Sequence, residues 1–330
     1  MSGVQTRYVA RNEADMRLDR WFKLHFPELP FGKLQKIVRK GEVRVNGKRA
    51  KTSQRLEVGM AIRIPPLGDA ATTKAPSGEK PKYVLTDADR KLAQSLVIYK
   101  DKDVLAINKP SGLAVQGGTK MERHLDGMLE ALTYDAEEKP RLVHRLDKDT
   151  SGVMLLARNR QSASDLGKVF KGRETRKIYW AILVGLPEMD SGTITLPLAK
   201  LPGKAGERMV VDTEEGKPSV TEFRVLERAG KRLCLVALWP KTGRTHQLRV
   251  HMAALGTPIL GDGKYGGQDA FIDGDEIEKR LHLHAREIDI PGSNARVKAP
   301  LPDHMKTTFK LFGFDGSDWL NEDPFEDLID

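Results

Sequence analysis

Short apolar runs rich in β-branched and aromatic residues recur after residue 95, and they restrict the fold of this chain more than any other feature. They span Leu96–Tyr99, Val104–Asn108, Val153–Ala157, Ile178–Val184, Val220–Leu226 and Leu233–Trp239. Helical patterns interrupt them at Arg123–Leu132, Ser162–Gly172 and His246–Leu255. Because strands and helices do not alternate regularly, we predict an α+β fold with a mixed, mostly antiparallel sheet and not a doubly wound one.

The N-terminal 65 residues carry a different pattern, with two short helices and a hairpin. Apolar side chains lie on one helical face in Arg17–Phe26 and in Phe31–Lys40, and Gly41 ends the second helix. Asn46-Gly47 is a hairpin turn signal. The segment holds 15 Lys and Arg against 6 Asp and Glu. This excess favours a polyanionic partner, although a solvated basic surface would give the same count.

A stretch with almost nothing to bury, residues 66–82, follows this unit and is typical of a linker. The far end of the chain, 313–330, holds 7 acidic residues and no basic one. We expect it to form a surface tail, with Trp319, Leu320 and Phe325 as the side chains able to dock it. The predicted domains are a small unit at 1–65, a linker at 66–90, a large unit at 91–312 and an acidic tail at 313–330.

Composition excludes several classes of protein. The longest apolar runs are too short to span a bilayer, and the N-terminus lacks the apolar stretch of a secretory signal. Cys234 is the only cysteine, so neither a disulfide framework nor a cysteine-based zinc site is expected. We therefore expect a cytoplasmic protein without a membrane partner.

Residues 144–152, HRLDKDTSG, form a polar segment that leads directly into the apolar run Val153–Ala157. A polar loop tied to a core strand is a place where a scaffold presents reactive groups. The same residues also fit a plain turn, in which Asp147 or Asp149 bonds to nearby backbone.

A second segment, GRTHQLRVH at 243–251, packs two arginines and two histidines into nine residues. Arg244 and Arg249 suit a phosphate or carboxylate partner, because a guanidinium forms bidentate contacts. Zinc ligands are conceivable among the histidines His246, His251, His282 and His284. No carboxylate or thiolate completes a recognisable ligand spacing, so we expect no metal.

Two further segments carry weaker signals. Tyr179 lies within KIYWAILVG, where a tyrosine is ordinarily part of the core with its hydroxyl at the rim. The KPSG loop, Lys109–Gly112, would let backbone approach a ligand closely, but it matches neither a Walker loop nor a dinucleotide fingerprint. No nucleotide cofactor is expected.

Taken together, these segments resemble the RluA family of pseudouridine synthases, most closely its RluC-type members, which act on large-subunit ribosomal RNA. The motifs occur in the family's order: VIYKDKDVLAINKPSG, HRLDKDTSG, KIYWAILVG, GKPSVTEFRVLE and KTGRTHQLRVHMAALGTPILGDGKYGG. The N-terminal unit is similar to the S4-like RNA-binding domain, on the residues LQKIVRKGEVRVNGKRAK. The resemblance covers about residues 94–312. Within it, the tract Leu201–Glu215 lies where family members vary in length and in RNA contacts, and the acidic tail beyond Phe312 has no counterpart.

The resemblance implies a pseudouridine synthase fold and assigns roles by position. Asp147 matches the catalytic aspartate, Arg145 the arginine that fills the gap left by a flipped uridine, and Tyr179 the tyrosine beside the target uracil. Arg249 matches the arginine that pairs with the aspartate. Further substrate-binding residues are predicted at His144, Arg244 and Leu248. Contacts with RNA are predicted at Lys33, Lys36, Arg39, Arg44 and Lys48. The implied enzyme isomerises uridines of 23S ribosomal RNA as a monomer, without a cofactor or a metal.

Two rival functions remain. A non-catalytic RNA-binding or ribosome-assembly factor would use the same basic unit, but it would not need Asp147 together with Tyr179 and Arg249. A zinc-dependent nucleobase deaminase needs a His/Cys/Cys site, which a single cysteine cannot supply. The combination of Asp147, Tyr179 and Arg249 therefore favours the isomerase.

Overall fold

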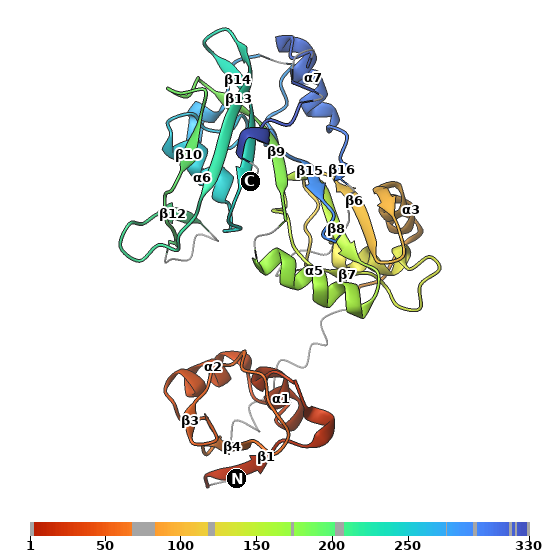
Figure 1. Ribbon diagram of the computed structural model, residues 1–330, viewed down its shortest axis with the longest axis vertical. Helices are drawn as coiled ribbons and strands as arrows, with labels where there is room; N and C mark the ends of the chain where they lie inside the picture. Colours follow the sequence, from red (N-terminus) through yellow and green to blue (C-terminus); the bar gives the residue numbers. More distant parts are fainter. Residues whose placement is uncertain are drawn as a thin grey trace. The chain divides into compact units, whose positions relative to one another are not determined.

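The computed structural model of the chain divides into two compact units, Met1–Lys82 and Tyr83–Asp330 (Figure 1). It describes residues 3–67, 83–117, 123–172, 175–201, 208–274, 276–292, 296–316, 319–320 and 322–328. Most of the predicted linker, 66–90, lies outside the described residues.

The first unit packs two helices on a small sheet of strand order β1-β4-β2-β3. Its elements are β1 (Gln5–Tyr8), η1 (Arg11–Glu13), α1 (Leu18–His25), α2 (Phe31–Arg39), β2 (Arg44–Val45), β3 (Lys48–Arg49) and β4 (Ala61–Ile64). Trp21 and Phe22 of α1 are buried in its core. Asn46 and Gly47 have φ values of 47° and 75°, as a tight hairpin turn of this kind requires. The two predicted helices and the hairpin are confirmed.

The second unit is built on one large sheet of order β10-β13-β14-β9-β15-β8-β6-β5, with β7 paired to β8 and β16 to β15. The strands are β5 (Val97–Lys100), β6 (Val104–Lys109), β7 (Arg141–Leu142), β8 (Ser151–Ala157), β9 (Lys177–Val184), β10 (Ser191–Ile194), β13 (Thr221–Ala229), β14 (Leu233–Pro240), β15 (Leu283–Asp289) and β16 (Arg296–Lys298). Among the described strand pairs of this sheet, only β15–β8 is parallel. The predicted mixed, mostly antiparallel sheet is confirmed.

Helices cover both faces of this sheet (Figure 1). They are α3 (Asp87–Ser95), α4 (Leu125–Met128), η3 (Leu129–Leu132), α5 (Arg160–Gly172), α6 (Gln247–Ala254), η4 (Gly267–Ala270), α7 (Asp303–Phe312) and η5 (Glu326–Leu328). A separate hairpin pairs β11 (Leu198–Lys200) with β12 (Met209–Val211). Along β9, Trp180 packs into the cluster that contains Phe309 of α7, whereas Tyr179 packs with the cluster that contains Leu248 of α6. The alternation of side chains thus places Tyr179 on the α6 face.

The second unit begins earlier than the predicted linker end at residue 90. Thr86 caps α3, because its hydroxyl accepts from the Asp89 amide at 3.1 Å while the Asp89 carboxylate accepts from the Thr86 amide at 3.3 Å. Tyr83 donates to the same carboxylate at 2.9 Å. Such a capping box stabilises the first turn of a helix. Residues 83–90 are therefore folded onto the large unit.

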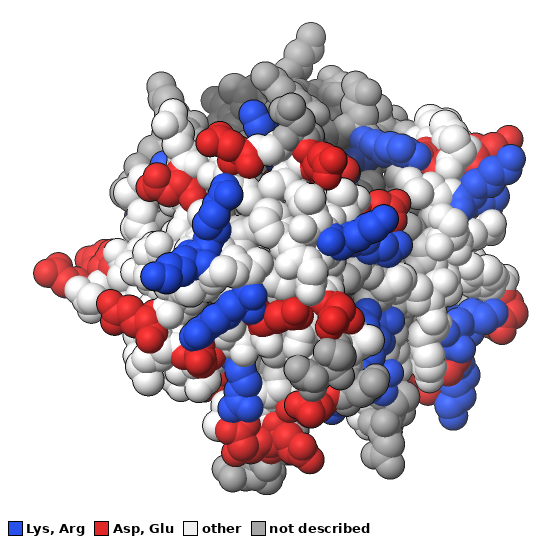
Figure 2. Space-filling model, turned by 90° about the horizontal axis from the view of Figure 1, so that it is seen from above, with Lys and Arg blue, Asp and Glu red and all other residues white. Residues whose placement is uncertain are grey.

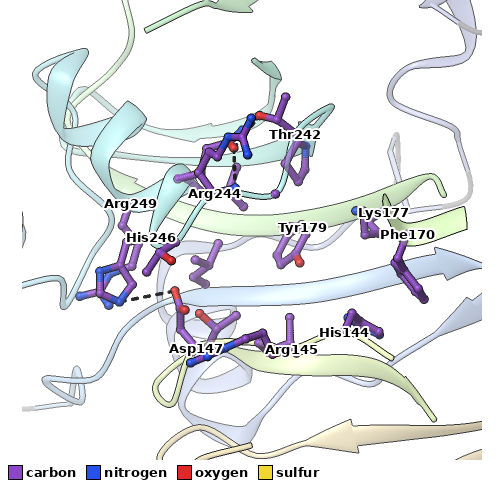
Figure 3. A pocket seen from close by; sticks show the side chains of 18 of the residues that line it. His144, Arg145, Asp147, Phe170, Lys177, Tyr179, Thr242, Arg244, His246 and Arg249 are labelled. Atoms are coloured by element: carbon purple, nitrogen blue, oxygen red, sulfur yellow. Dashed lines mark hydrogen bonds and ion pairs between the residues drawn. The ribbon is translucent and has the colours of Figure 1, made fainter. Parts of the chain in front are cut away.

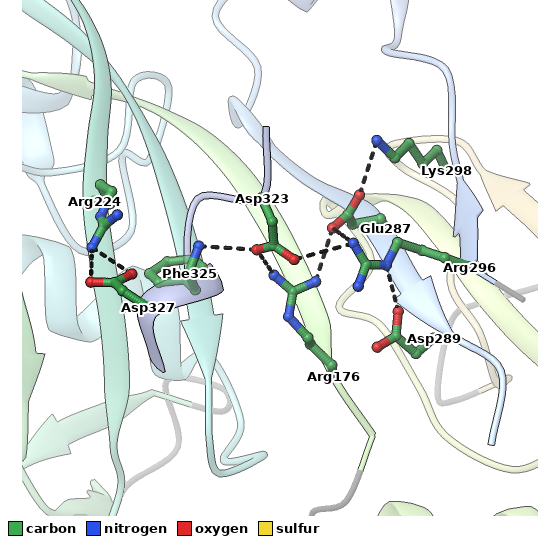
Figure 4. A network of polar contacts seen from close by, with 9 residues as sticks. All are labelled: Arg176, Arg224, Glu287, Asp289, Arg296, Lys298, Asp323, Phe325 and Asp327. Atoms are coloured by element: carbon green, nitrogen blue, oxygen red, sulfur yellow. Dashed lines mark hydrogen bonds and ion pairs between the residues drawn. The ribbon is translucent and has the colours of Figure 1, made fainter. Parts of the chain in front are cut away.

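The described part of the acidic C-terminal segment is docked on the sheet, and a plain surface tail is the wrong description (Figure 4). Phe325 is 1% exposed, and Asp323 pairs with the buried Arg176. Asp327 accepts two bonds from Arg224 of β13, at 2.9 and 2.8 Å. Each contact joins residues more than 100 positions apart, so their neighbours in sequence give no sign of them.

Trp319 docks in the same segment, whereas Leu320 does not. The indole of Trp319 donates to Glu227 at 2.7 Å and meets the Trp180 ring at a centroid distance of 5.0 Å. Leu320 stays 42% exposed. Of the side chains predicted as able to dock the segment, Trp319 and Phe325 are confirmed.

The face drawn in Figure 2 carries acidic and basic side chains interspersed, without a broad patch of one sign. Among the described residues, the helices are all too short or too polar to cross a bilayer.

Candidate active site

The HRLD loop, residues 144–150, is held at the start of β8, where this strand pairs with a strand that lies far away in the sequence. Ser151 and Gly152 pair in parallel with His284 and Ala285 of β15. Gly152 has a φ of 114°, and a Cβ there would lie 2.2 Å from the Ala285 carbonyl oxygen. Only glycine tolerates both conditions, so this residue permits the close approach that fixes the loop. The buried Leu146 anchors the loop from inside.

A cavity of about 440 Å³ opens beside this loop (Figure 3). Its walls come from the HRLD loop, α5, β9, the loop after β14 and the first turn of α6. All residues predicted for catalysis and substrate binding line it: His144, Arg145, Asp147, Tyr179, Arg244, Leu248 and Arg249. Thus the fold gathers side chains from three of the sequence motifs in one place.

Asp147 lies partly exposed in the cavity and faces His246. The Nε2 atom of His246 is 3.8 Å from the Oδ2 atom of Asp147. His246 has a φ of 53°, a left-handed conformation that is uncommon for residues other than glycine. It directly precedes α6, and its ring enters the cavity.

Arg249 has a different partner from the one that the resemblance implied. Its Nε and Nη2 atoms donate to the two carboxylate oxygens of Asp262, at 2.8 and 2.6 Å. Both residues are buried. Burial lowers the pKa of Arg249, but the bonds and charge of Asp262, helped by the charge of Asp147, raise it overall. The expected direct pairing with Asp147 is therefore wrong in its geometry, and Arg249 acts on Asp147 through space.

Tyr179 points into the cavity from β9. Burial, and to a smaller extent the charge of Asp147, raises the pKa of Tyr179 well above its ordinary value. The hydroxyl consequently keeps its proton at neutral pH. A protonated phenol can stack on a base or donate a hydrogen bond, but it is a poor proton acceptor.

His144, which is predicted to contact the substrate, lines the cavity and also supports the fold there. Its Nε2 atom accepts from the Leu155 amide at 2.9 Å, and its ring stacks on Phe170 at 4.3 Å. Burial, helped by the charge of Lys177, lowers the pKa of His144 to about 3. The ring is therefore neutral and braces the wall of the cavity.

The remaining predicted residues differ in what they offer. Arg145 is exposed at the rim of the cavity. Arg244 donates through Nε to the Pro218 carbonyl at 3.1 Å, which fixes its side chain beside the cavity. Leu248 is buried and contributes an apolar part of the wall.

The histidines considered as zinc ligands use their ring nitrogens in hydrogen bonds to the fold. His251 bonds Thr221 and the Leu196 carbonyl, and His284 bonds Ser151 and the Ala299 carbonyl. His282 bonds the Arg280 carbonyl at 2.8 Å and Thr308 at 2.9 Å. Each of the three is fully buried. These hydrogen bonds explain why the three histidines are buried.

Lys109 of the KPSG loop is a feature that sequence reasoning missed. Its side chain is fully buried, and Nζ lies 2.9–3.0 Å from three carbonyl oxygens. These carbonyls belong to Pro110, Leu113 and Lys148. Burial lowers the pKa of Lys109 to about 7, against the charges of Asp149 and Asp147. Three acceptors match the three N–H groups of an ammonium. The KPSG loop thus supports the HRLD loop, because Lys109 bonds the Lys148 carbonyl and Ser111 the Asp149 carbonyl.

In the first unit, the five residues predicted to contact RNA differ in their exposure and in their own hydrogen bonds. Lys36 and Arg39 are exposed and line a shallow groove with Lys51 and Thr52. Lys33 donates to the Leu67 carbonyl at 2.8 Å. Arg44 donates to the Gly41 and Gly47 carbonyls at 3.4 and 3.2 Å, whereas Lys48 is exposed in the hairpin.

Comparisons with known proteins identify both parts of the chain. The family model described as RNA pseudouridylate synthase matches residues 103–254, and the S4 domain model matches residues 16–62. Ribosomal large subunit pseudouridine synthase C of Rickettsia conorii is 37% identical over 87% of this chain and 94% of its own length. The protein of the same name from Salmonella typhimurium is 37% identical over 92% of this chain and 95% of its own.

Relatives from eukaryotes share the same similarity. RNA pseudouridine synthase 4, mitochondrial, of Arabidopsis thaliana is 33% identical over 88% of this chain and 78% of its own length. The solved structure of human RNA Pseudouridylate Synthase Domain Containing 4 superposes with a TM-score of 0.59 at 30% identity, over 68% of this chain and 97% of that one.

Proposed function

The chain belongs to the RNA pseudouridylate synthase family, and we propose that it converts uridines of large-subunit (23S) ribosomal RNA to pseudouridine with Asp147 as the catalytic carboxylate. The observation that carries the proposal is the position of Asp147 in a cavity lined by the HRLD, KIYW and GRTHQLR segments. The cavity volume, about 440 Å³, lies within the range of roughly 300–1,000 Å³ found for small-molecule sites.

The chemistry needs a carboxylate and no redox partner. The N1–C1′ bond of uridine breaks, the uracil turns, and a C5–C1′ bond forms, after which C5 loses its proton and N1 holds one. Positive charge develops near C1′ while the base is detached, as it does in glycoside hydrolysis. An aspartate can stabilise that charge, bond to the sugar or base, or take the C5 proton. Its partly exposed position in the cavity supports each of these roles for Asp147.

The residues around Asp147 are assigned the remaining roles in binding the flipped uridine. A uracil within a helix must leave the stack before it can enter the cavity, at a cost of a few kcal/mol. We assign Arg145 to filling the space that the base leaves, and its exposure at the rim supports this role. Tyr179 keeps its proton, so we assign it to contact with the uracil ring and not to proton removal. Leu248 packs against the same space.

A direct assay tests this proposal against a non-catalytic RNA-binding factor. The purified chain is incubated with unmodified 23S ribosomal RNA, and pseudouridines are mapped over time. New pseudouridine at defined positions is the expected result. Tight binding without any pseudouridine, in RNA folded with and without ribosomal proteins, would favour the binding factor. Cytoplasmic location and a monomeric state belong to the same proposal.

Activity should survive exhaustive EDTA treatment at neutral pH. The proposed steps use only side chains of the chain, and the buried histidines spend their nitrogens on hydrogen bonds. The measurement is pseudouridine formation before and after chelation, with the RNA folded beforehand in magnesium and the magnesium level restored in both samples. Loss of activity that zinc alone restores would contradict the prediction.

Removing the charges of Lys36 and Arg39 should weaken RNA binding with little effect on the chemical step. Both side chains are exposed on α2, and contacts of this kind are largely independent of sequence. In the Lys36→Ala/Arg39→Ala variant we expect a higher KM for ribosomal RNA, an unchanged kcat, and a salt slope lower by at most about two units. Replacing the exposed Lys91 and Lys310 of α3 and α7 is the matched control. An unchanged KM would mean that these two charges only solvate the helix.

A further inference from the structure

His246 and Tyr265 form a contact beside Asp147 that neither the sequence motifs nor the proposed chemistry explains. The Nδ1 atom of His246 lies 2.6 Å from the Tyr265 hydroxyl oxygen. The same oxygen accepts from the Met209 amide at 3.1 Å. Tyr265 follows the Asp262 that holds Arg249, so one short segment supports two residues of the cavity.

The direction of these bonds determines where the histidine proton lies. Burial, helped by the charges of Asp262 and Asp147, raises the pKa of Tyr265 against the Met209 amide and Arg249, so the hydroxyl stays protonated. The Tyr265 oxygen accepts from the Met209 N–H, and its own proton can be donated to the Nδ1 atom of His246. A neutral imidazole carries one proton, and an Nδ1 that accepts leaves it on Nε2. That nitrogen faces Asp147 at 3.8 Å.

The backbone supports the same arrangement. His246 is held at φ 53° and ψ 20°, a conformation that non-glycine residues adopt rarely and mostly where the surrounding structure imposes it. The Gln247 side chain contributes to this support, because it accepts from the Arg244 amide at 3.1 Å and from Thr242 at 2.7 Å. The loop is thus fastened on both sides of the histidine.

We propose that Tyr265 is a positioning residue that fixes His246 as its Nε2–H tautomer, so that His246 presents a hydrogen-bond donor to Asp147. This inference rests on the proposed function for its effect on catalysis. At 3.8 Å the Nε2 atom lies within ion-pair range of Oδ2, and catalytic hydrogen bonds commonly tighten only when substrate binds. A donor at Oδ2 would fix the rotamer of the carboxylate and leave its second oxygen for the substrate.

The hairpin β11–β12 gains a role from this arrangement. Met209 begins β12, and its amide directs the Tyr265 hydroxyl toward His246. The tract that the family resemblance left unassigned, Leu201–Glu215, therefore contributes a backbone donor to the site. Residues 202–207 of that tract lie outside the described residues.

Nitrogen NMR of the histidine side chains tests the tautomer without any activity assay. In ¹⁵N-histidine-labelled protein, His246 is assigned by the signals lost in His246→Gln, and at pH 8 it should appear as the Nε2–H form. In Tyr265→Phe, the Nδ1–H form should become populated. Tyr99→Phe on β5 removes a tyrosine hydroxyl that donates to Asp101, and it should leave the His246 signals unchanged. A single Nε2–H form that persists in Tyr265→Phe would overturn the inference.

Kinetics give the second readout. Tyr265→Phe should lower kcat for pseudouridine formation about tenfold, the equivalent of one net hydrogen bond, while the KM for RNA stays constant. A variant with normal kcat would overturn the catalytic part of the inference. If the wild-type chain makes no pseudouridine, the proposed function fails, whereas the NMR result still decides the tautomer.

Discussion

Replacing Asp147 by Asn should abolish pseudouridine formation and leave a folded protein that still binds RNA. The amide preserves the shape of the side chain but removes the negative charge that the reaction requires near C1′ and C5. We expect kcat to fall by at least about a hundredfold, because removing one stabilising group from a site commonly costs roughly 10²–10³. The measurement is single-turnover pseudouridine formation at saturating RNA, with RNA affinity measured in parallel.

The matched control for this change is Asp149→Asn, two residues along the same loop. Asp149 is exposed and does not line the cavity. Its replacement should leave kcat within about threefold of the wild type, since surface substitutions rarely cost more than about 0.5 kcal/mol. Residual turnover of Asp147→Asn within tenfold of the wild type would remove Asp147 from the mechanism. Equal losses in both variants would point to damage of the loop.

The second large effect should be a loss of stability in acid, caused by buried neutral histidines. Burial lowers the pKa of His284 to about 3 and that of His282 to about 4, from an ordinary value of 6.5. Burial also lowers the pKa of His251 and of His304. A histidine of this kind binds its proton more readily in the unfolded chain.

The sign of the effect follows from this difference. Above pH 6.5 these histidines are neutral in both the folded and the unfolded chain, so they do not lower the free energy of unfolding. As the pH falls from 6.5 toward 4 or 3, the unfolded chain gains protons that the folded chain does not, and stability decreases. At pH 5, His282 and His284 should together cost about 4 kcal/mol, at roughly 1.4 kcal/mol per histidine and pH unit. That is a large part of the roughly 5–15 kcal/mol that stabilises a domain.

Denaturant unfolding of the full chain between pH 8 and pH 4.5 measures this loss. Carboxylates also titrate in acid, so a variant must isolate the histidine contribution. His284→Gln keeps an amide that can bond Ser151 or the Ala299 carbonyl, but it does not titrate in this range. The variant should be less stable at pH 8 and should show a pH slope smaller by about one proton. An unchanged slope would mean that His284 is not held neutral in the fold.

Much of the large sheet could be predicted from the sequence, because its central strands are buried on both faces. Such strands read as continuous apolar runs, and Val153–Ala157 and Leu233–Trp239 lie within β8 and β14. β15 was not predicted, since LHLHAREID reads as polar. The structure buries His284 within this strand and His282 just before it by giving their nitrogens partners from distant segments.

The candidate site was predicted as a set of residues but not as a set of contacts. Asp147, Tyr179 and Arg249 all line the cavity. Which groups bond to each other was not predictable, because Arg249 pairs with Asp262 and not with Asp147. The partner came from ILGDGKYGG, a segment that belonged to a motif but had no role assigned.

The sequence by itself determined the family, the two folded units, the hairpin at Asn46-Gly47 and the carboxylate at Asp147. These follow from local patterns, in which residue types and short spacings are decisive. Only the tertiary structure decided the neutral state of His144, the contact of His246 with Tyr265 and the docking of the C-terminal segment. Each depends on burial and on partners from distant parts of the chain, such as Asp323 with Arg176, 147 residues apart. Pairing over such distances is selected by packing, and a linear pattern of residue types does not record it.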